Sequence, residues 1–242
     1  MTVASPHGTA PPWGVWATIG WLVVAFLVST LVAVGCYGLW QSAHPRAAPS
    51  AFDGVLIAIG ALVSVPMQIA VLSMAARVRG WSAPDYLALT LPRRAEVIVA
   101  IVCVIALDVV FSLLLLLTGH DLVTPFQVEA YRSAKEVGWL FWLLVAIVVF
   151  APIGEEIAFR GFLYRGLARP GYELYAIVAI AVSWAAMHIQ YDWIGVLQVF
   201  AIGVLLGWIR WASGSTLLPI LMHMLINAEA MIETAIKVEY LS

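Results

Sequence analysis

Long apolar runs constrain this chain more than any other feature. A transmembrane helix takes about 20 mostly apolar residues, and about seven stretches meet that requirement. They cover approximately residues 13–40, 55–76, 95–117, 139–156, 174–189, 193–211 and 217–236. Hydrophobic residues make up 63% of the 242-residue chain and charged residues 11%, against about 45–50% and about 25% in a soluble domain. The sequence therefore predicts an all-α, polytopic bundle of about seven transmembrane helices.

The rest of the composition narrows the class of protein. No connector is long enough for a soluble domain, so we expect a single integral membrane domain over residues 1–242. An eighth weak span, or a run that we split wrongly, would change the count and reverse the side of the C-terminus. A net charge of −2 gives no reason to expect nucleic-acid binding. Cys36 and Cys103 lie within apolar runs and are interpreted as small hydrophobic residues, not as a disulfide.

Arginines in the connectors predict the orientation. Eight fall in the connections after the second, fourth and sixth runs: Arg77, Arg79, Arg93, Arg94, Arg160, Arg165, Arg169 and Arg210. The other connections hold Arg46, Arg132 and Lys135. Because cytoplasmic loops carry the excess of Lys and Arg, this pattern predicts a cytoplasmic N-terminus and, with seven spans, an external C-terminus. We expect a multi-pass protein of a bacterial inner (plasma) membrane.

Two connectors have a pattern of their own. Residues 81–89 mix aromatic residues with few charges and could lie flat in the interface. The spacing of apolar residues over 125–137 predicts a short amphipathic helix on the outer face. We favour ordinary solvated connectors over recognition elements for both.

The most costly residues are the charges of the fourth run. A charge at bilayer depth costs about 2.5–3.5 kcal/mol on insertion scales, so intramembrane charges are usually paired and functional. Glu156 and Arg160 are four residues apart, which places them on one helix face and predicts an ion pair. Glu155 points about 100° away from them and stays free for another partner. Taken alone, the group could equally be a juxtamembrane charge cluster.

Two later spans carry further polar groups. His188 follows Trp184 by four residues, and His223 precedes Asn227 by four on one face of the last span. Singly, they could be an interfacial histidine and hydrogen-bonding contacts between helices. Together with Glu155 they form a set suited to hydrolysis. A carboxylate with an imidazole can deprotonate a water, and the remaining His and Asn can donate hydrogen bonds to an oxyanion.

In order and spacing, these motifs resemble the CPBP family, also called Abi, of CAAX prenyl endopeptidases and bacteriocin-processing or bacteriocin-immunity proteins. The likeness covers about residues 139–230, the catalytic core in the last four spans, and includes Arg160-Gly161-Phe162-Leu163-Tyr164. It implies an intramembrane glutamic protease in which Glu155 and His188 activate water. It further implies that His223 and Asn227 form the oxyanion hole and that Glu156, Arg160 and Trp184 support the site. The second motif usually begins with Phe, where this chain has Trp184, a bulkier aromatic that should preserve packing and could reshape the substrate cleft.

Several alternatives stay open at this point. Two histidines and two glutamates could hold zinc, although the chain has no His-Glu-x-x-His. The resemblance favours a site without a cofactor. A non-catalytic scaffold or immunity protein, and a proton-relay transporter, are the other classes. As partners we expect the lipid bilayer and a membrane-tethered peptide or protein substrate, prenylated or leader-bearing, reached from the cytoplasm.

The predicted boundaries contain a conflict of depth. With straight helices, Glu155 lies near the cytoplasmic end of the fourth span, whereas His188 lies toward the outside in the fifth, about 15 Å away in depth at a rise of 1.5 Å per residue. A kink at Pro152–Gly154, or a fourth helix that continues through Tyr164, would resolve it. Asp108 could line the substrate cavity or pair with a buried donor such as Gln68, and we favour the pairing. Glu229 and Glu233 are interpreted as interfacial charges.

Overall fold

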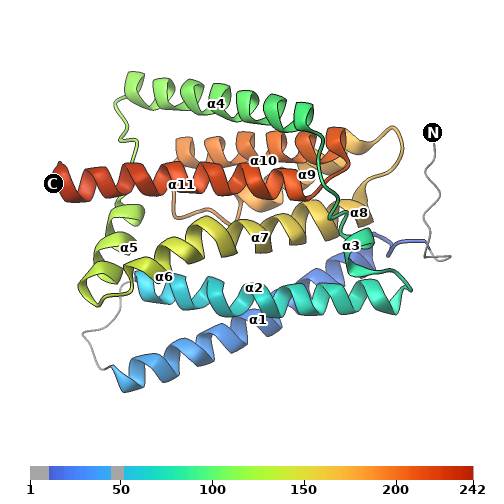
Figure 1. Cartoon of the computed structure of the whole chain (residues 1–242), viewed down its shortest axis with the longest axis horizontal. Coiled ribbons are helices and arrows are strands. Elements are labelled where there is room, and N and C mark those ends of the chain that lie inside the picture. Colours follow the sequence, from blue (N-terminus) through green and yellow to red (C-terminus); the bar gives the residue numbers. More distant parts are fainter. Residues whose placement is uncertain (1–10, 45–51, 242) are drawn as a thin grey trace.

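The structure is a bundle of roughly aligned helices. The computed structural model describes residues 11–44 and 52–241, which form helices and no strands. Six helices in this part of the chain are long and apolar enough to cross a membrane: α1 (Val15–Ala43), α2 (Gly54–Val78), α4 (Arg94–Leu117), the composite helix Leu140–Leu167, α10 (Trp193–Ser213) and α11 (Leu217–Tyr240). The shorter helices are α3 (Ala83–Tyr86), α5 (Pro125–Glu136) and α9 (Glu173–Ala185). The chain begins at one end of the bundle and finishes at the other (Figure 1). We call these the N-terminal and C-terminal ends.

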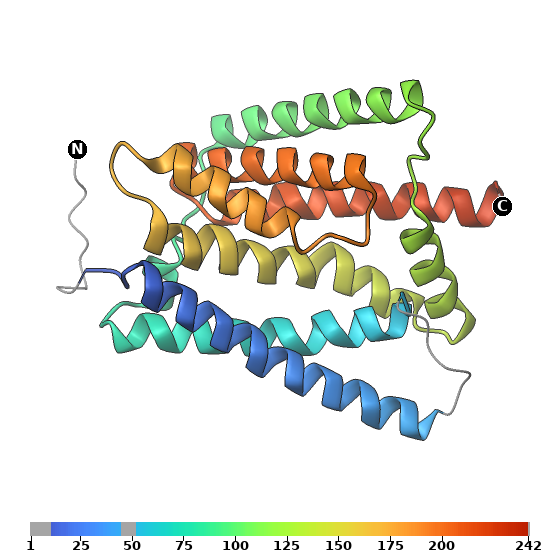
Figure 2. The same cartoon turned by 180° about the vertical axis from the view of Figure 1, so that it is seen from behind.

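The predicted polytopic helical class is confirmed, but the count of about seven spans needs a correction. The fifth run forms α9, which has only 13 residues. At 1.5 Å per residue it is about 20 Å long, short of the hydrocarbon core of about 30 Å. The chain then continues through residues 186–192 to α10, and this irregular connection lies well inside the length of the bundle (Figure 2). Irregular backbone at membrane depth is tolerated only where it is buried or lines a wet cavity.

The fourth run was predicted to end at the paired glutamates, and that boundary was wrong. The helix continues to Leu167 and comprises α6 (Leu140–Val145), a π-helical turn, α7 (Ala151–Glu156), a second π-helical turn and α8 (Tyr164–Leu167). Glu155 is the sixteenth of its 28 residues and so lies near the middle. The predicted conflict in depth between Glu155 and His188 is thus resolved for two reasons. The helix of Glu155 is longer than predicted, and α9 ends before it has crossed the bundle. The alternative that the fourth helix continues through Tyr164 is therefore confirmed.

The first π-helical turn (Ala146–Phe150) explains how Pro152 is accommodated. In this turn the N–H of Ala151 donates to the carbonyl of Ala146, five residues back. The same pattern would pair Pro152 with Ile147, but proline has no N–H. The freed Ile147 carbonyl instead accepts a hydrogen bond from Asn227 Nδ2 at 2.8 Å. A side chain of α11 thereby repairs the backbone of the helix that carries Glu155.

The connector at residues 81–89 is not a solvated loop, contrary to expectation. It contains α3, and Tyr86 and Leu87 are fully buried in the main core. Thr216, directly before α11, donates its hydroxyl to the Leu87 carbonyl at 2.6 Å, and Ser215 donates to the carbonyl of Thr90 at 2.5 Å. The segment is therefore tied across the N-terminal end of the bundle.

The predicted amphipathic helix at residues 125–137 is confirmed as α5. Thr124 caps it and exchanges hydrogen bonds with Gln127. Helix α5 packs on α2 and α11 at the C-terminal end. The contact with α2 is close, because the backbone N–H of Gly54 donates to Ser133 Oγ at 2.9 Å.

Candidate active site

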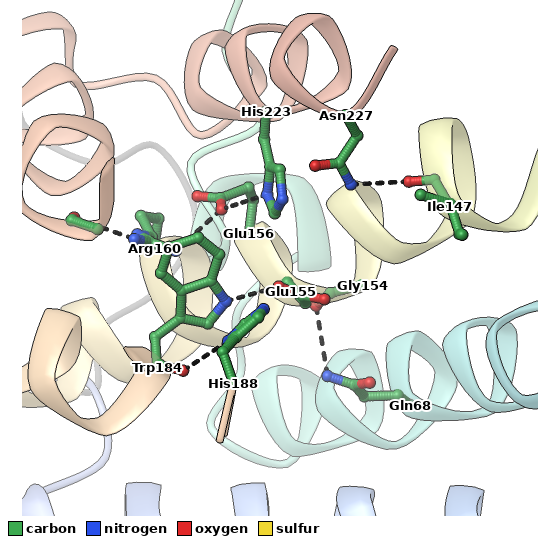
Figure 3. A network of polar contacts seen from close by, with 11 residues as sticks. Gln68, Ile147, Gly154, Glu155, Glu156, Arg160, Trp184, His188, His223 and Asn227 are labelled. Carbon is green, nitrogen blue, oxygen red and sulfur yellow. Dashed lines mark hydrogen bonds and ion pairs between the residues drawn. The ribbon is translucent and has the colours of Figure 1, made fainter. Parts of the chain in front are cut away.

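The predicted ion pair of the composite helix lies at the centre of a buried polar network. Arg160 Nη1 donates to Glu156 Oε1 at 2.9 Å, and both side chains are at most 1% exposed. Nδ1 of His223, on α11, lies 3.0 Å from the same oxygen. Arg160 Nη2 donates to the carbonyl of Gly203 on α10 at 3.0 Å. The pair therefore ties three helices together at mid-depth (Figure 3).

Burial of Arg160 also corrects the predicted orientation count. Arg160 was counted among the eight connector arginines that predicted the orientation, but it lies inside the composite helix and pairs with Glu156. It carries no information about orientation, so seven of the eight arginines remain.

Glu155 and Trp184 make a contact that the sequence did not reveal. The indole Nε1–H of Trp184 donates to Glu155 Oε2 at 2.5 Å. The guanidinium of Arg160 lies over the Trp184 ring, 4.8 Å from its centroid. Trp184 was expected to preserve packing and to affect the shape of the cleft, and it also supplies a hydrogen bond that the usual phenylalanine lacks. The departure from the family pattern was the one available signal.

His188, which follows the end of α9, is held in one tautomer by a carbonyl of that helix. Its Nδ1 lies 2.9 Å from the carbonyl oxygen of Trp184. A carbonyl can only accept, so Nδ1 carries the hydrogen and Nε2 of the neutral ring keeps a lone pair. The ring lies edge-on to Trp184, with centroids 4.9 Å apart, and stacks on Tyr191. Glu155 and His188 are thus both attached to Trp184, one to its indole and one to its backbone.

Two amides bind the backbone around Glu155. Asn227 donates to Ile147, and Gln68 of α2 donates to the carbonyl of Gly154 at 3.3 Å. The expected pairing of Gln68 with Asp108 was wrong in its partner, because Gln68 reaches the composite helix. The Asn227 amide has a second N–H beyond the one given to Ile147.

All four residues proposed as catalytic line one cavity of about 280 Å³: Glu155, His188, His223 and Asn227. Asp108, Glu229 and Glu233 line the same cavity, and Asp108 interacts with both glutamates. Glu229 and Glu233 are therefore not simple interfacial charges. Both were assigned to the interface because they follow His223 and Asn227 toward the end of the last span, and their place in the cavity wall was not predicted.

The donor set does not fit a zinc site. Catalytic zinc takes three protein ligands, and no group of three His, Cys, Asp or Glu side chains in residues 11–44 and 52–241 is placed to hold one metal ion. His223 already contacts Glu156, and His188 contacts a backbone carbonyl through Nδ1. We derive no step through a metal.

The fold and the cavity define a polytopic helical membrane protein with a polar pocket at mid-depth. Residues 137–228 match the family model for Type II CAAX prenyl endopeptidase Rce1-like, so the chain contains a domain of this family, whose members are peptide hydrolases. The match coincides with the segment whose motifs carried the resemblance. A search of curated proteins found no match, and neither did a search of solved structures.

Proposed function

We propose that this protein is an intramembrane endopeptidase that uses Glu155 and His188 to activate water. The observation that carries the proposal is the convergence of Glu155, His188, His223 and Asn227, from three separate segments, on one cavity. The family match supports the reaction class, and the geometry supports the roles.

Glu155 has the environment of a general base. One carboxylate oxygen is fixed by Trp184, and the other accepts no hydrogen bond from any residue in the described ranges. That oxygen can take a proton from a water that His188 Nε2 also holds. The resulting hydroxide adds to the peptide carbonyl carbon. When the C–N bond breaks, the proton held by Glu155 passes to the leaving amine, so one water is consumed for each bond cleaved.

His223 and Asn227 are placed to stabilise the oxyanion. Asn227 has one amide N–H left to donate. His223 faces Glu156 through Nδ1 and can present Nε2 to the cavity. Nε2 donates only if it carries a proton, as an imidazolium does or as a ring that shares a proton with Glu156 does. Donors of this kind typically contribute about 2.7–4 kcal/mol each to transition-state stabilisation.

The test is cleavage of membrane-tethered peptides by the protein reconstituted in proteoliposomes. Glu155→Ala, Glu155→Gln and His188→Ala should each abolish cleavage, while Glu173→Gln, remote at the start of α9, should not. Retained cleavage in the Glu155 and His188 variants would refute the mechanism. Wild-type protein that is folded but cleaves nothing would favour the scaffold or immunity alternative. Loss of activity with a chelator and recovery with zinc would favour the metalloprotease.

The membrane setting of the proposal follows from composition and charge. The six candidate spans indicate a multi-pass integral membrane protein. We further propose a bacterial inner membrane and a cytoplasmic N-terminus, which the arginines of the N-terminal end support.

A further inference from the structure

The active-site cavity runs in one direction from the catalytic residues. Its floor is at mid-depth, at Trp184 and His223. The part of its wall farthest from this floor lies at the C-terminal end of the bundle and consists of Asp121, Leu122, Thr124, Phe126, Gln127 and Glu233. These residues belong to the α4–α5 connection, to α5 and to the distal half of α11. The cavity therefore extends from mid-depth to the C-terminal end, and we call it the funnel.

The opposite end of the bundle is closed by packed side chains. Tyr86 and Phe162 are fully buried, with ring centroids 5.3 Å apart. Leu218, at the start of α11, is 1% exposed in the same core. The hydrogen bonds from Thr216 and Ser215 hold residues 87–90 against these packed side chains. A peptide cannot reach Glu155 from the N-terminal end without unpacking the core.

The basic residues lie mostly at the closed end. Among the described residues, seven arginines lie there: Arg77, Arg79, Arg93, Arg94, Arg165, Arg169 and Arg210. The open end has Arg132, Lys135 and Lys237 among the described residues. The positive-inside rule therefore places the closed end in the cytoplasm.

We infer that the funnel opens on the outer, non-cytoplasmic side of the membrane. The substrate is then a peptide segment exposed at the outer surface, next to a transmembrane span or a lipid anchor. Lipid-modified tails that face the cytoplasm are excluded as substrates. The expectation that the site is reached from the cytoplasm conflicts with the predicted cytoplasmic N-terminus, because the cavity opens at the opposite end of the bundle. We retain the predicted orientation and give up cytoplasmic access. That this peptide is cleaved rests on the proposed function, whereas the side on which the cavity opens does not.

Cysteine accessibility tests the side of the opening without requiring catalysis. The full chain would carry Cys36→Ala and Cys103→Ala, then one new cysteine each at Asp121, Gln198 and Arg169. Asp121 is exposed at the rim, Gln198 lies in the cavity wall, and Arg169 is exposed at the closed end. The probe is a cationic, membrane-impermeant methanethiosulfonate added to spheroplasts of a bacterial expression host.

We expect Asp121→Cys and Gln198→Cys to react in intact spheroplasts, and Arg169→Cys only after permeabilisation. Leu122→Cys, in the same wall, repeats the measurement without disturbing the ion pair between Asp121 and Lys237. Reaction of Arg169→Cys with protection of the others would overturn the inference, and so would reaction of all of them before permeabilisation.

A cleavage assay separates this inference from the proposed function. A tethered peptide whose scissile segment lies outside should be cleaved in a Glu155-dependent manner, and the same peptide presented inside should not. The expected labelling without Glu155-dependent cleavage would refute the protease and leave the orientation standing. Reversed labelling with cleavage of the inside peptide would refute the orientation and leave the protease standing.

Discussion

Trp184 joins the two members of the proposed catalytic pair. Its indole N–H fixes one oxygen of Glu155, and its carbonyl fixes Nδ1 of His188. The indole also lies against the guanidinium of Arg160. One residue thus orients the base, sets the histidine tautomer and contacts the buried ion pair.

Trp184→Phe should therefore lower kcat while leaving KM nearly unchanged. A hydrogen bond to a charged group contributes about 1.5–3 kcal/mol, which corresponds to a loss of about 10- to 100-fold in kcat. Steady-state kinetics on the reconstituted protein would measure it. Trp142→Phe, half exposed on the bundle surface, is the matched control. An unchanged kcat in Trp184→Phe would show that the indole N–H does not orient Glu155.

Arg160→Met should destabilise the fold strongly. It removes the cation and keeps the volume, so that the Glu156 charge is left buried at 0% exposure. Breaking a buried pair in this way costs about 3–5 kcal/mol. Thermal unfolding in detergent would report the loss. The double variant Glu156→Gln, Arg160→Met should recover much of it, and Arg132→Met, an exposed arginine on α5, should have little effect. A stable single variant would contradict the pairing.

Helices α2 and α7 pack closely at Gly154. A Cβ added at Gly154 would lie 2.5 Å from Cγ2 of Val65. Gly154→Ala should thus push the two helices apart and lower the free energy of unfolding by about 1–3 kcal/mol. Gly60→Ala, on α2 and with open space around it, should be neutral. Val65→Ala, which shortens the α2 side chain that Gly154 faces, should rescue Gly154→Ala. Equal stability of the two alanine variants would show that the helices do not need this contact.

The long helices were predictable because length and apolar composition alone determine a span. The predicted and observed limits of α4 differ by one residue at the start, and α5 was predicted from the spacing of its apolar residues. The depth of the site was not predictable, since it depends on partners far away in sequence. Arg160 resembles the end of a span until His223 and Glu156 are known to share its environment. The indole bond of Trp184 likewise requires the position of Glu155, 29 residues away.

At the scale of the whole molecule, the funnel is acidic. Its wall includes the carboxylates Asp108, Asp121, Asp192, Glu229 and Glu233, and none of the described residues that line it is Lys or Arg. Peptides with Lys or Arg beside the scissile bond should therefore show a lower KM than peptides with Asp or Glu. The difference should shrink at high salt, because the screening length falls from about 10 Å at 0.1 M to about 3 Å at 1 M.

Peptide pairs that differ only in these flanking charges, assayed at both salt concentrations, would check this expectation. Asp121→Asn with Asp192→Asn should reduce the discrimination, and Asp85→Asn, at the closed end, should not. Equal KM values at low salt would show that the wall carboxylates do not select the substrate.

The irregular connection at residues 186–192 links the stability of the fold to hydration. Its backbone polar groups lie at a depth where lipid offers no partners, and each unsatisfied group there would cost several kcal/mol. The cavity wall that includes His188, Gln190, Tyr191 and Asp192 gives these groups access to water. The N–H groups of Ala186, Met187, His188 and Tyr191 already donate to backbone carbonyls, so a purely hydrocarbon ligand in the funnel would displace that water and leave only the remaining polar groups of the connection unpaired. A tight inhibitor must therefore carry its own donors and acceptors at the positions that the displaced waters occupied.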